Sequence, residues 1–221
     1  MNSEKQPEIS PVQKERTARM YEVYQRQPYL IELDGIKLNV ARGVFPPEQG
    51  YTTKLMAKVI KTYSVNTVLD MGCGSGYLAL TLRKNKVPNV WAADLNQAAV
   101  ECTKENIKNN PDLAPIEVVH SNLFSQISPE IKFDLIVFNQ PFYYGNGPFN
   151  VSPDEGRPLN ERFLKEARNY LKSDGKILMN YSDLGDEINN PKGTAELLGY
   201  QVKVKLMEQG ESFSNEVYEF S

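Results

Sequence analysis

A short stretch from Asp70 to Gly76 combines one acidic residue with three glycines, in the order Asp-x-Gly-x-Gly-x-Gly. An apolar run precedes it and a helix-compatible segment follows it, so the pattern predicts a strand, a tight turn and a helix. Glycine accepts backbone angles that other residues avoid and lets a ligand approach the main chain, and the following helix N-terminus offers free N–H groups. The stretch therefore predicts a cofactor site.

The spacing of the glycines distinguishes between two cofactors. A dinucleotide site requires Gly-x-Gly-x-x-Gly, but Tyr77 stands where the third glycine would fall. The carboxylate of Asp70 would repel a pyrophosphate, whereas it would attract a cationic sulfonium and ammonium ligand. A second acidic residue, Asp94, lies 24 positions after Asp70, near the roughly 20-residue spacing at which a carboxylate binds ribose hydroxyls. Alternatively, Asp94 only caps the helix that begins near Asn96.

The Val-Leu-Asp strand and the glycine loop together resemble the S-adenosylmethionine motif of class I methyltransferases. In that family the acidic residue faces the methionine end of the cofactor, and the glycines pass beneath the sulfonium and the sugar. The resemblance therefore implies S-adenosyl-L-methionine as the cofactor. The implied contacts in this part of the chain are Asp70, Gly72, Gly74, Gly76, Asp94 and Leu95.

A second candidate site follows the apolar run 133–138, where the chain continues with Asn139, Gln140, Pro141 and Phe142. This turn resembles that of the methyltransferase small-domain group, which includes release-factor glutamine methyltransferases and enzymes that methylate exocyclic amines of adenine or guanine. Their strand ends in Asn-Pro-Pro-Tyr or Asn-Pro-Pro-Phe. The resemblance implies that the Asn139 oxygen and the Gln140 carbonyl accept the hydrogens of a planar NH2 group, while the Phe142 ring packs on its face. Asn139 is assigned to the cofactor site as well, because it would aim the nitrogen at the methyl group.

These residue types suit methyl transfer to a poor nucleophile. The lone pair of an amide or aniline-like nitrogen is delocalised, and two fixed acceptors on its hydrogens favour the positive charge that develops there. No general base is strictly required. Gln140 replaces the family's first proline, which keeps the carbonyl but removes the ring that fixes its direction, and its side-chain amide is a further candidate substrate contact. A strand-ending turn without chemistry is the alternative for this segment.

The resemblance covers roughly residues 44–181. Phe45 and Thr53 stand in or next to a segment that closes over the cofactor in the family. Asn122 and Leu123 stand in a turn that resembles the family's Asp-Leu-Phe turn, where the acid receives the adenine amine, and an asparagine oxygen can accept the same hydrogen. The single histidine, His120, is interpreted as packing at a strand end because no carboxylate partner is apparent in the sequence.

The elements that must position these residues alternate between strand and helix from residue 66 onward. Open α/β sheets bind ligands at the carboxyl ends of their strands, which would bring the candidate side chains to one rim. The runs 201–207 and 214–220 leave no room for a crossover helix and should pair antiparallel at the sheet edge. The predicted fold is therefore α/β, with a Rossmann-like, doubly wound, mostly parallel sheet and an antiparallel C-terminal edge. Strands are expected at 67–70, 90–94, 116–120, 133–138 and 176–180, and helices at 52–63, 76–84, 97–108 and 160–171.

The first 50 residues have a different pattern. A short helix with several basic residues is followed by two alternating runs, 29–33 and 36–40, joined by Asp34 and Gly35. An Asp-Gly pair between such runs is a strong signal for a β-hairpin. We expect an N-terminal helix and hairpin extension over residues 1–50 and a class I methyltransferase domain over residues 51–221.

The composition excludes several function classes. Two cysteines and one histidine in 221 residues allow neither a disulfide framework nor a zinc cluster, and no metal site is expected. A net charge of −3 argues weakly against a broad nucleic-acid footprint. Neither a membrane-spanning run nor a signal-peptide pattern is present, so a cytoplasmic location is expected. The loop 142–149 carries four aromatic residues and is interpreted as either a substrate lid or a packed flap.

The combined prediction is an S-adenosylmethionine-dependent N-methyltransferase. Its acceptor would be a protein glutamine, an RNA base or a small molecule, without a membrane partner, and the sequence does not indicate an oligomeric state. One alternative is a nicotinamide-dependent Rossmann oxidoreductase, which the glycine spacing disfavours. The other is a non-catalytic methyltransferase-fold partner subunit, for which Gln140 is the only indication.

Overall fold

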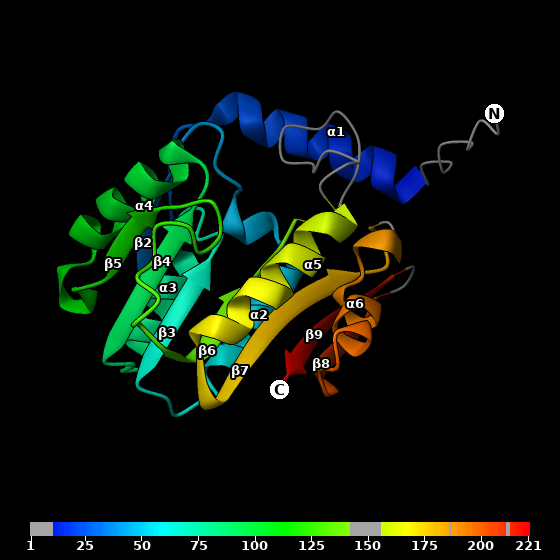
Figure 1. Ribbon diagram of the computed structural model, residues 1–221. Coiled ribbons are helices and arrows are strands. Elements are labelled where there is room, and N and C mark those ends of the chain that lie inside the picture. Colours follow the sequence, from blue (N-terminus) through cyan, green and yellow to red (C-terminus); the bar gives the residue numbers. More distant parts are fainter. Residues whose placement is uncertain (1–10, 142–155, 186, 211–212) are drawn as a thin grey trace.

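The computed structural model describes residues 11–141, 156–185, 187–210 and 213–221. Its central layer is a seven-stranded sheet in the order β5-β4-β3-β6-β7-β9-β8, with helices on both faces (Figure 1). The five neighbouring strands from β5 to β7 in this order run parallel. Beyond them, β9 pairs antiparallel with β7, and the edge strand β8 pairs antiparallel with β9. This architecture confirms the predicted α/β fold. The strands are β3 Thr67–Met71, β4 Asn89–Asp94, β5 Glu117–His120, β6 Phe133–Phe138, β7 Leu171–Ser182, β8 Val202–Gln209 and β9 Ser214–Phe220.

The strand order reverses between β3 and β6. The chain first adds β4 and β5 on one side of β3 and then returns to place β6 on its other side. Carboxyl ends of strands at such a reversal form the usual ligand crevice of an open α/β sheet. The ends of β3 and β6, which are neighbours in the sheet, therefore lie side by side at this reversal.

An apolar core lies on each face of the sheet, between the strands and the helices that cover that face. On one face, α2 and α3 pack against alternate strand residues such as Val137 and Leu178. On the other face, α5 packs against the intervening residues, including Phe138 and Met179. This alternation follows from the pleat of a β-strand, in which successive side chains point to opposite faces. The helices are α2 Tyr51–Ile60, α3 Tyr77–Lys84, α4 Gln97–Asn109, α5 Gly156–Ala167 and α6 Pro191–Leu197 (Figure 1).

The N-terminal segment contains α1 (Pro11–Arg26) and the predicted hairpin, β1 (Tyr29–Leu33) paired with β2 (Ile36–Val40). Ile36 and Leu38 are fully buried in the same core as α2 and α3. The end of α1 is also tied to the chain that follows, because the Gln27 amide donates to the Val44 carbonyl over 2.6 Å. The segment thus contributes apolar side chains to the core of the main sheet.

Two differences from the sequence prediction concern the second half of the chain. The predicted helix 160–171 is α5, which begins and ends earlier, because Leu171 already pairs with Phe133 as the first residue of β7. Pro158 fits the first turn of α5, where a backbone N–H has no partner within the helix. Helix α6 was not predicted, although Asn190 caps it by accepting from the Lys192 N–H over 3.1 Å.

Among the described helices, none is long and apolar enough to cross a membrane.

Candidate active site

The glycine loop adopts the conformation that its sequence predicts. Gly72, Gly74 and Gly76 have φ angles of 68°, 55° and 78°, a region that side chains with a Cβ rarely adopt. A Cβ on Gly76 would lie 2.9 Å from the Thr103 side chain, so this glycine also allows close packing of the loop on α4. A Cβ on Gly74 would have Val44 Cγ1 at 4.0 Å as its nearest neighbour among the described atoms. The space beside the Gly74 Cα is therefore open to a ligand, while its N–H and carbonyl are bonded to Asp94 and Thr103.

Asp70 lies at the base of this loop and is 1% exposed. One carboxylate oxygen accepts from the Ala79 N–H over 3.0 Å, while the other has no hydrogen-bond partner in the part of the chain that the structure describes. Burial raises the pKa of Asp70 to about 8, and the nearby Asp94 adds to this rise. Asp70 is thus a buried acid whose ionisation a neighbouring cation would favour.

Asp94 ends β4 and holds the glycine loop. Its Oδ2 accepts from the Gly74 N–H and its Oδ1 from the Asn96 N–H, each over 2.9 Å. Burial raises the pKa of this carboxyl group. The N-cap of α4 is Asn96, whose side chain accepts from the Ala98 N–H. The alternative interpretation of Asp94 as the helix cap is therefore wrong: its carboxylate accepts from the glycine loop and from the N–H of the capping residue, Asn96.

Asn139 follows β6 and is fixed by α2. Its Nδ2 donates to the Thr53 hydroxyl over 2.9 Å, and Thr53 is itself buried. Its Oδ1 is also buried and has no hydrogen-bond partner within residues 11–141, 156–185, 187–210 and 213–221. A Cβ on Gly50 would approach the Thr53 hydroxyl to 2.2 Å, so the N-terminus of α2 requires a glycine there. The outcome is an acceptor oxygen held in place at the end of β6.

Gln140 differs from the sequence hypothesis. Its side chain is 3% exposed, and its Nε2 donates to the backbone carbonyls of Asn180 and Asn189 over 3.3 and 3.1 Å. The hypothesis that this side-chain amide is a further substrate contact is therefore wrong, because the amide is turned into the protein. The same two bonds restrain the turn after β6 where the family uses a proline ring. Pro141 is exposed, whereas Phe142 and the aromatic loop 142–149 lie outside the described residues.

The residues expected around an adenine ring differ in their exposure and in their hydrogen bonds. Leu95 is 64% exposed, so its apolar side chain is available to a ligand. Leu123 is buried and has a φ of 50°. The Asn122 oxygen already accepts from the Arg162 guanidinium of α5, a contact that the sequence did not indicate. The His120 side chain is exposed, and its ring bonds to the Leu95 carbonyl over 2.8 Å. The interpretation of this histidine as a packed residue is therefore not confirmed, and its charge acts on the nearby Asp94, where it opposes the rise in pKa that burial causes.

Phe45 is half-buried and lies close to the start of α2, since a Cβ on Gly50 would be 3.1 Å from its ring. The structure thus places the glycine loop at the end of β3 and Asp94 at the end of β4, where the two are hydrogen-bonded, and it pairs Thr53 with Asn139 at the end of β6. In the described residues, no three His, Cys, Asp or Glu side chains are grouped as metal ligands.

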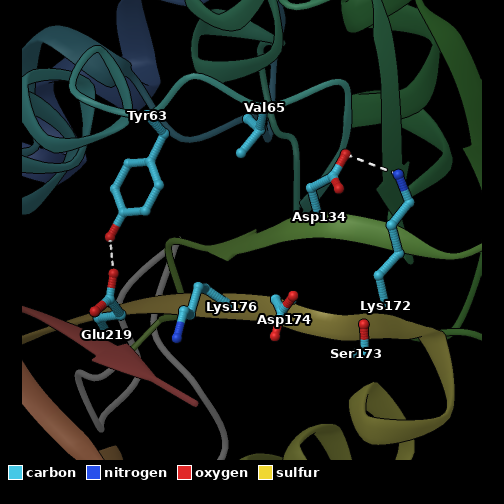
Figure 2. Close-up of a pocket in the computed structure, with 9 residues that line it drawn as sticks. Tyr63, Val65, Asp134, Lys172, Ser173, Asp174, Lys176 and Glu219 are labelled. Carbon is cyan, nitrogen blue, oxygen red and sulfur yellow. Dashed lines mark hydrogen bonds and ion pairs between the residues drawn. The ribbon is translucent and has the colours of Figure 1, made fainter.

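A separate cavity of about 330 Å³ lies at the opposite end of the strands, where β6 and β7 begin (Figure 2). Within it, Asp134 contacts Lys172 over 2.9 Å, and the Tyr63 hydroxyl donates to Glu219. This cavity contains none of the predicted site residues.

Comparisons with known proteins identify the family. The family description "Methyltransferase small domain" matches residues 35–186. A putative protein N5-glutamine methyltransferase of Methanocaldococcus jannaschii is 32% identical over 79% of this chain and 90% of that protein. The ribosomal RNA small subunit methyltransferase C of Photorhabdus laumondii is 28% identical over 82% of this chain, which spans only 52% of that protein.

Among solved structures, the 16S rRNA N2 G1207 methyltransferase of T. thermophilus, in complex with AdoMet and guanosine, has a TM-score of 0.63. It is 18% identical, and the match covers 87% of this chain and 49% of that one, so it shows a shared fold. The match of the family description, which spans more than half of the chain, and the 32% identical relative carry the assignment. The chain belongs to the methyltransferase small domain family and is an S-adenosylmethionine-dependent methyltransferase.

Proposed function

We propose that this enzyme transfers a methyl group to the nitrogen of a primary carboxamide, the side chain of a glutamine in a protein substrate. One observation carries the proposal: Asn139 Oδ1 is buried, fixed through Thr53 and unpaired in the structure's described residues. A buried acceptor without a partner is costly unless a ligand supplies the donor. A planar NH2 group supplies that donor.

The residues of the crevice fit the cofactor. The space beside Gly74 is open, Asp70 has an oxygen without a partner among the described residues that could face a cationic group, and Asp94, at the end of β4, would accept from the ribose hydroxyls. Leu95 offers an exposed apolar side chain to the adenine ring. Leu123, being buried, would line this end through its backbone. When bound, S-adenosylmethionine supplies an electrophilic methyl group on a sulfonium.

The chain's own contribution to the reaction is orientation. Asn139 Oδ1 and the Gln140 carbonyl would each accept one hydrogen of the acceptor NH2, which fixes the plane of the amide and turns its lone pair toward the cofactor. Both acceptors favour the positive charge that develops on nitrogen before a proton leaves. The hydrogen bonds of the buried Gln140 side chain fix the direction of the Gln140 backbone carbonyl. The absence of the family's first proline therefore does not require a loss of activity.

Two observations favour a protein acceptor over RNA. The glutamine methyltransferase relative is matched over 90% of its length, whereas about half of the rRNA relative has no counterpart in this chain. The net charge of −3 also differs from the positive surface that phosphate binding requires. The nicotinamide alternative is not favoured by the family.

The proposal is tested by transfer of labelled methyl groups from S-adenosylmethionine into a cell extract, followed by separation of protein, RNA and small molecules. We expect label in protein, released on hydrolysis as methylamine from N5-methylglutamine. Label in RNA or in the small-molecule fraction alone would overturn the glutamine assignment. The Asn139→Ala enzyme serves as the control for labelling that does not depend on the site.

The Thr53 hydroxyl provides a test of how Asn139 is held. Thr53→Val keeps the shape but removes the atom that accepts from Asn139 Nδ2. We expect turnover at saturating cofactor to fall about tenfold, the effect of losing one buried hydrogen bond. Thr53→Ser keeps the hydroxyl and should retain most activity. If instead only cofactor affinity falls, Thr53 contacts the cofactor and does not position Asn139.

The buried Asp70 predicts a pH dependence of cofactor binding. Because its pKa is raised to about 8 in the empty protein, the carboxyl group is mostly protonated at neutral pH, and a cationic ligand must displace that proton. Affinity should therefore rise with pH by up to about tenfold per pH unit as the pH approaches about 8. Titration calorimetry in buffers of different ionisation enthalpy measures the released proton. Asp70→Asn should abolish this release; a release that persists in the variant would assign it to another group.

A further inference from the structure

Asn180 is a buried amide that the site described above does not use. It lies in β7, is 0% exposed, and neither its side-chain oxygen nor its side-chain nitrogen has a hydrogen-bond partner among the described residues. An amide left unpaired in a protein interior costs free energy at each of its polar atoms. Such a residue points to a ligand that pairs with it.

The sheet places Asn180 beside Asn139. In the parallel register of β6 and β7, Phe138 lies opposite Met179, so the next residue on each strand is Asn139 and Asn180. Met179 and Tyr181 belong to the core under α5, and by the alternation of a strand Asn180 projects to the α2 face. Asn139 projects to that same face, since it bonds to Thr53 of α2.

Asn180 is also tied to the turn after β6. Its backbone carbonyl accepts from the Gln140 side chain over 3.3 Å. This hydrogen bond therefore links the strand that carries Asn180 to the turn that carries the two proposed acceptors. Two unpaired amide side chains therefore project to one face of adjacent strand ends.

The polar groups at these two strand ends match a primary carboxamide. Such a group has two N–H donors and one carbonyl acceptor. Asn139 Oδ1 and the Gln140 carbonyl take the two donors, which leaves the substrate carbonyl to be satisfied. We infer that Asn180 is a specificity-determining residue whose Nδ2 donates a hydrogen bond to the carbonyl of the acceptor carboxamide. This inference rests on the proposed function and extends it to a second side of the substrate.

The test uses N-acetyl-L-glutamine methylamide as the probe, titrated into the full-length protein in the presence of S-adenosylhomocysteine and followed by NMR of side-chain amides. We expect the Asn180 NH2 signals to shift, and Asn180→Leu to weaken probe binding about tenfold or more without a change in S-adenosylhomocysteine affinity. The melting temperature of Asn180→Leu should stay equal or rise, because an apolar side chain replaces an unpaired buried amide.

A matched control is Asn160→Leu, which removes another fully buried amide. Asn160 lies on α5; its Nδ2 donates to the Asn189 carbonyl over 3.0 Å, whereas its Oδ1 has no hydrogen-bond partner among the described residues. Its replacement should lower the melting temperature because that one hydrogen bond is lost, and it should leave probe affinity unchanged because α5 covers the other face of the sheet. If Asn139→Ala weakens the probe but Asn180→Leu does not, the role of Asn180 is wrong and the proposed function stands. If guanosine or adenosine binds and the probe does not, or if nothing binds, the carboxamide proposal fails and the role of Asn180 with it.

Discussion

Replacing Asn139 with alanine is expected to lower turnover by roughly a hundredfold or more, as the loss of one oriented stabilising group typically does. The physical reason is that Asn139 Oδ1 is fixed before the substrate arrives, since the Thr53 hydroxyl holds the other end of the amide. Asn139 Oδ1 therefore does not have to reorient when charge develops on the substrate nitrogen at the transition state. Single-turnover methyl transfer at saturating cofactor measures the effect.

Cofactor affinity should remain unchanged in this variant, because the residues proposed to hold the cofactor lie on the glycine loop and at the end of β4. Calorimetry with S-adenosylhomocysteine provides the comparison. Asn110→Ala is a suitable control: Asn110 makes side-chain hydrogen bonds to Lys37, away from the crevice, and its loss should leave turnover intact. An equal loss of turnover and cofactor affinity in Asn139→Ala would mean that Asn139 supports the fold or the cofactor instead.

The second large effect concerns the cofactor. Asp94→Ala should weaken cofactor binding by on the order of 1.5–3 kcal/mol if charge-assisted bonds to the ribose are lost, which is roughly a ten- to hundredfold higher Kd. The same change also frees the Gly74 and Asn96 N–H groups that the carboxylate now accepts from. Some loosening of the glycine loop is therefore part of the expected result.

A control for this structural part is Asp134→Ala. Asp134 likewise accepts from two backbone N–H groups, those of Asn66 and Thr67, but at the opposite end of the strands. A drop in melting temperature without a change in cofactor affinity is expected there. If Asp134→Ala and Asp94→Ala have the same effects, or if Asp94→Ala leaves affinity unchanged, Asp94 is only a brace for the loop.

The features that the sequence predicted well depend on local rules. The glycine loop needs positive φ angles at three positions, and only glycine adopts them without strain, so its presence was predictable from seven consecutive residues. The run 133–138 is confirmed as β6 with the same bounds. The hairpin at 29–40 is confirmed as well, since its Asp-Gly turn is a local signal.

Features that join distant parts of the chain were not predictable in this way. The hydrogen bond between Thr53 and Asn139 spans 86 positions, and no periodicity relates two such residues. The inward direction of Gln140 depends on carbonyls at positions 180 and 189. The pairing of Leu171 with Phe133 overrode a helical pattern, because tertiary pairing decides such boundaries.

The sequence by itself thus determined the cofactor class, because the motif that indicates it consists of one strand, one turn and one helix in succession. Only the tertiary structure decided how the proposed acceptor site is formed. It places Asn139, Gln140 and Asn180 on adjacent strand ends and shows which of their polar atoms are already paired. Pairing of buried polar groups is a property of the whole packed chain, and the acceptor is therefore inferred from the fold.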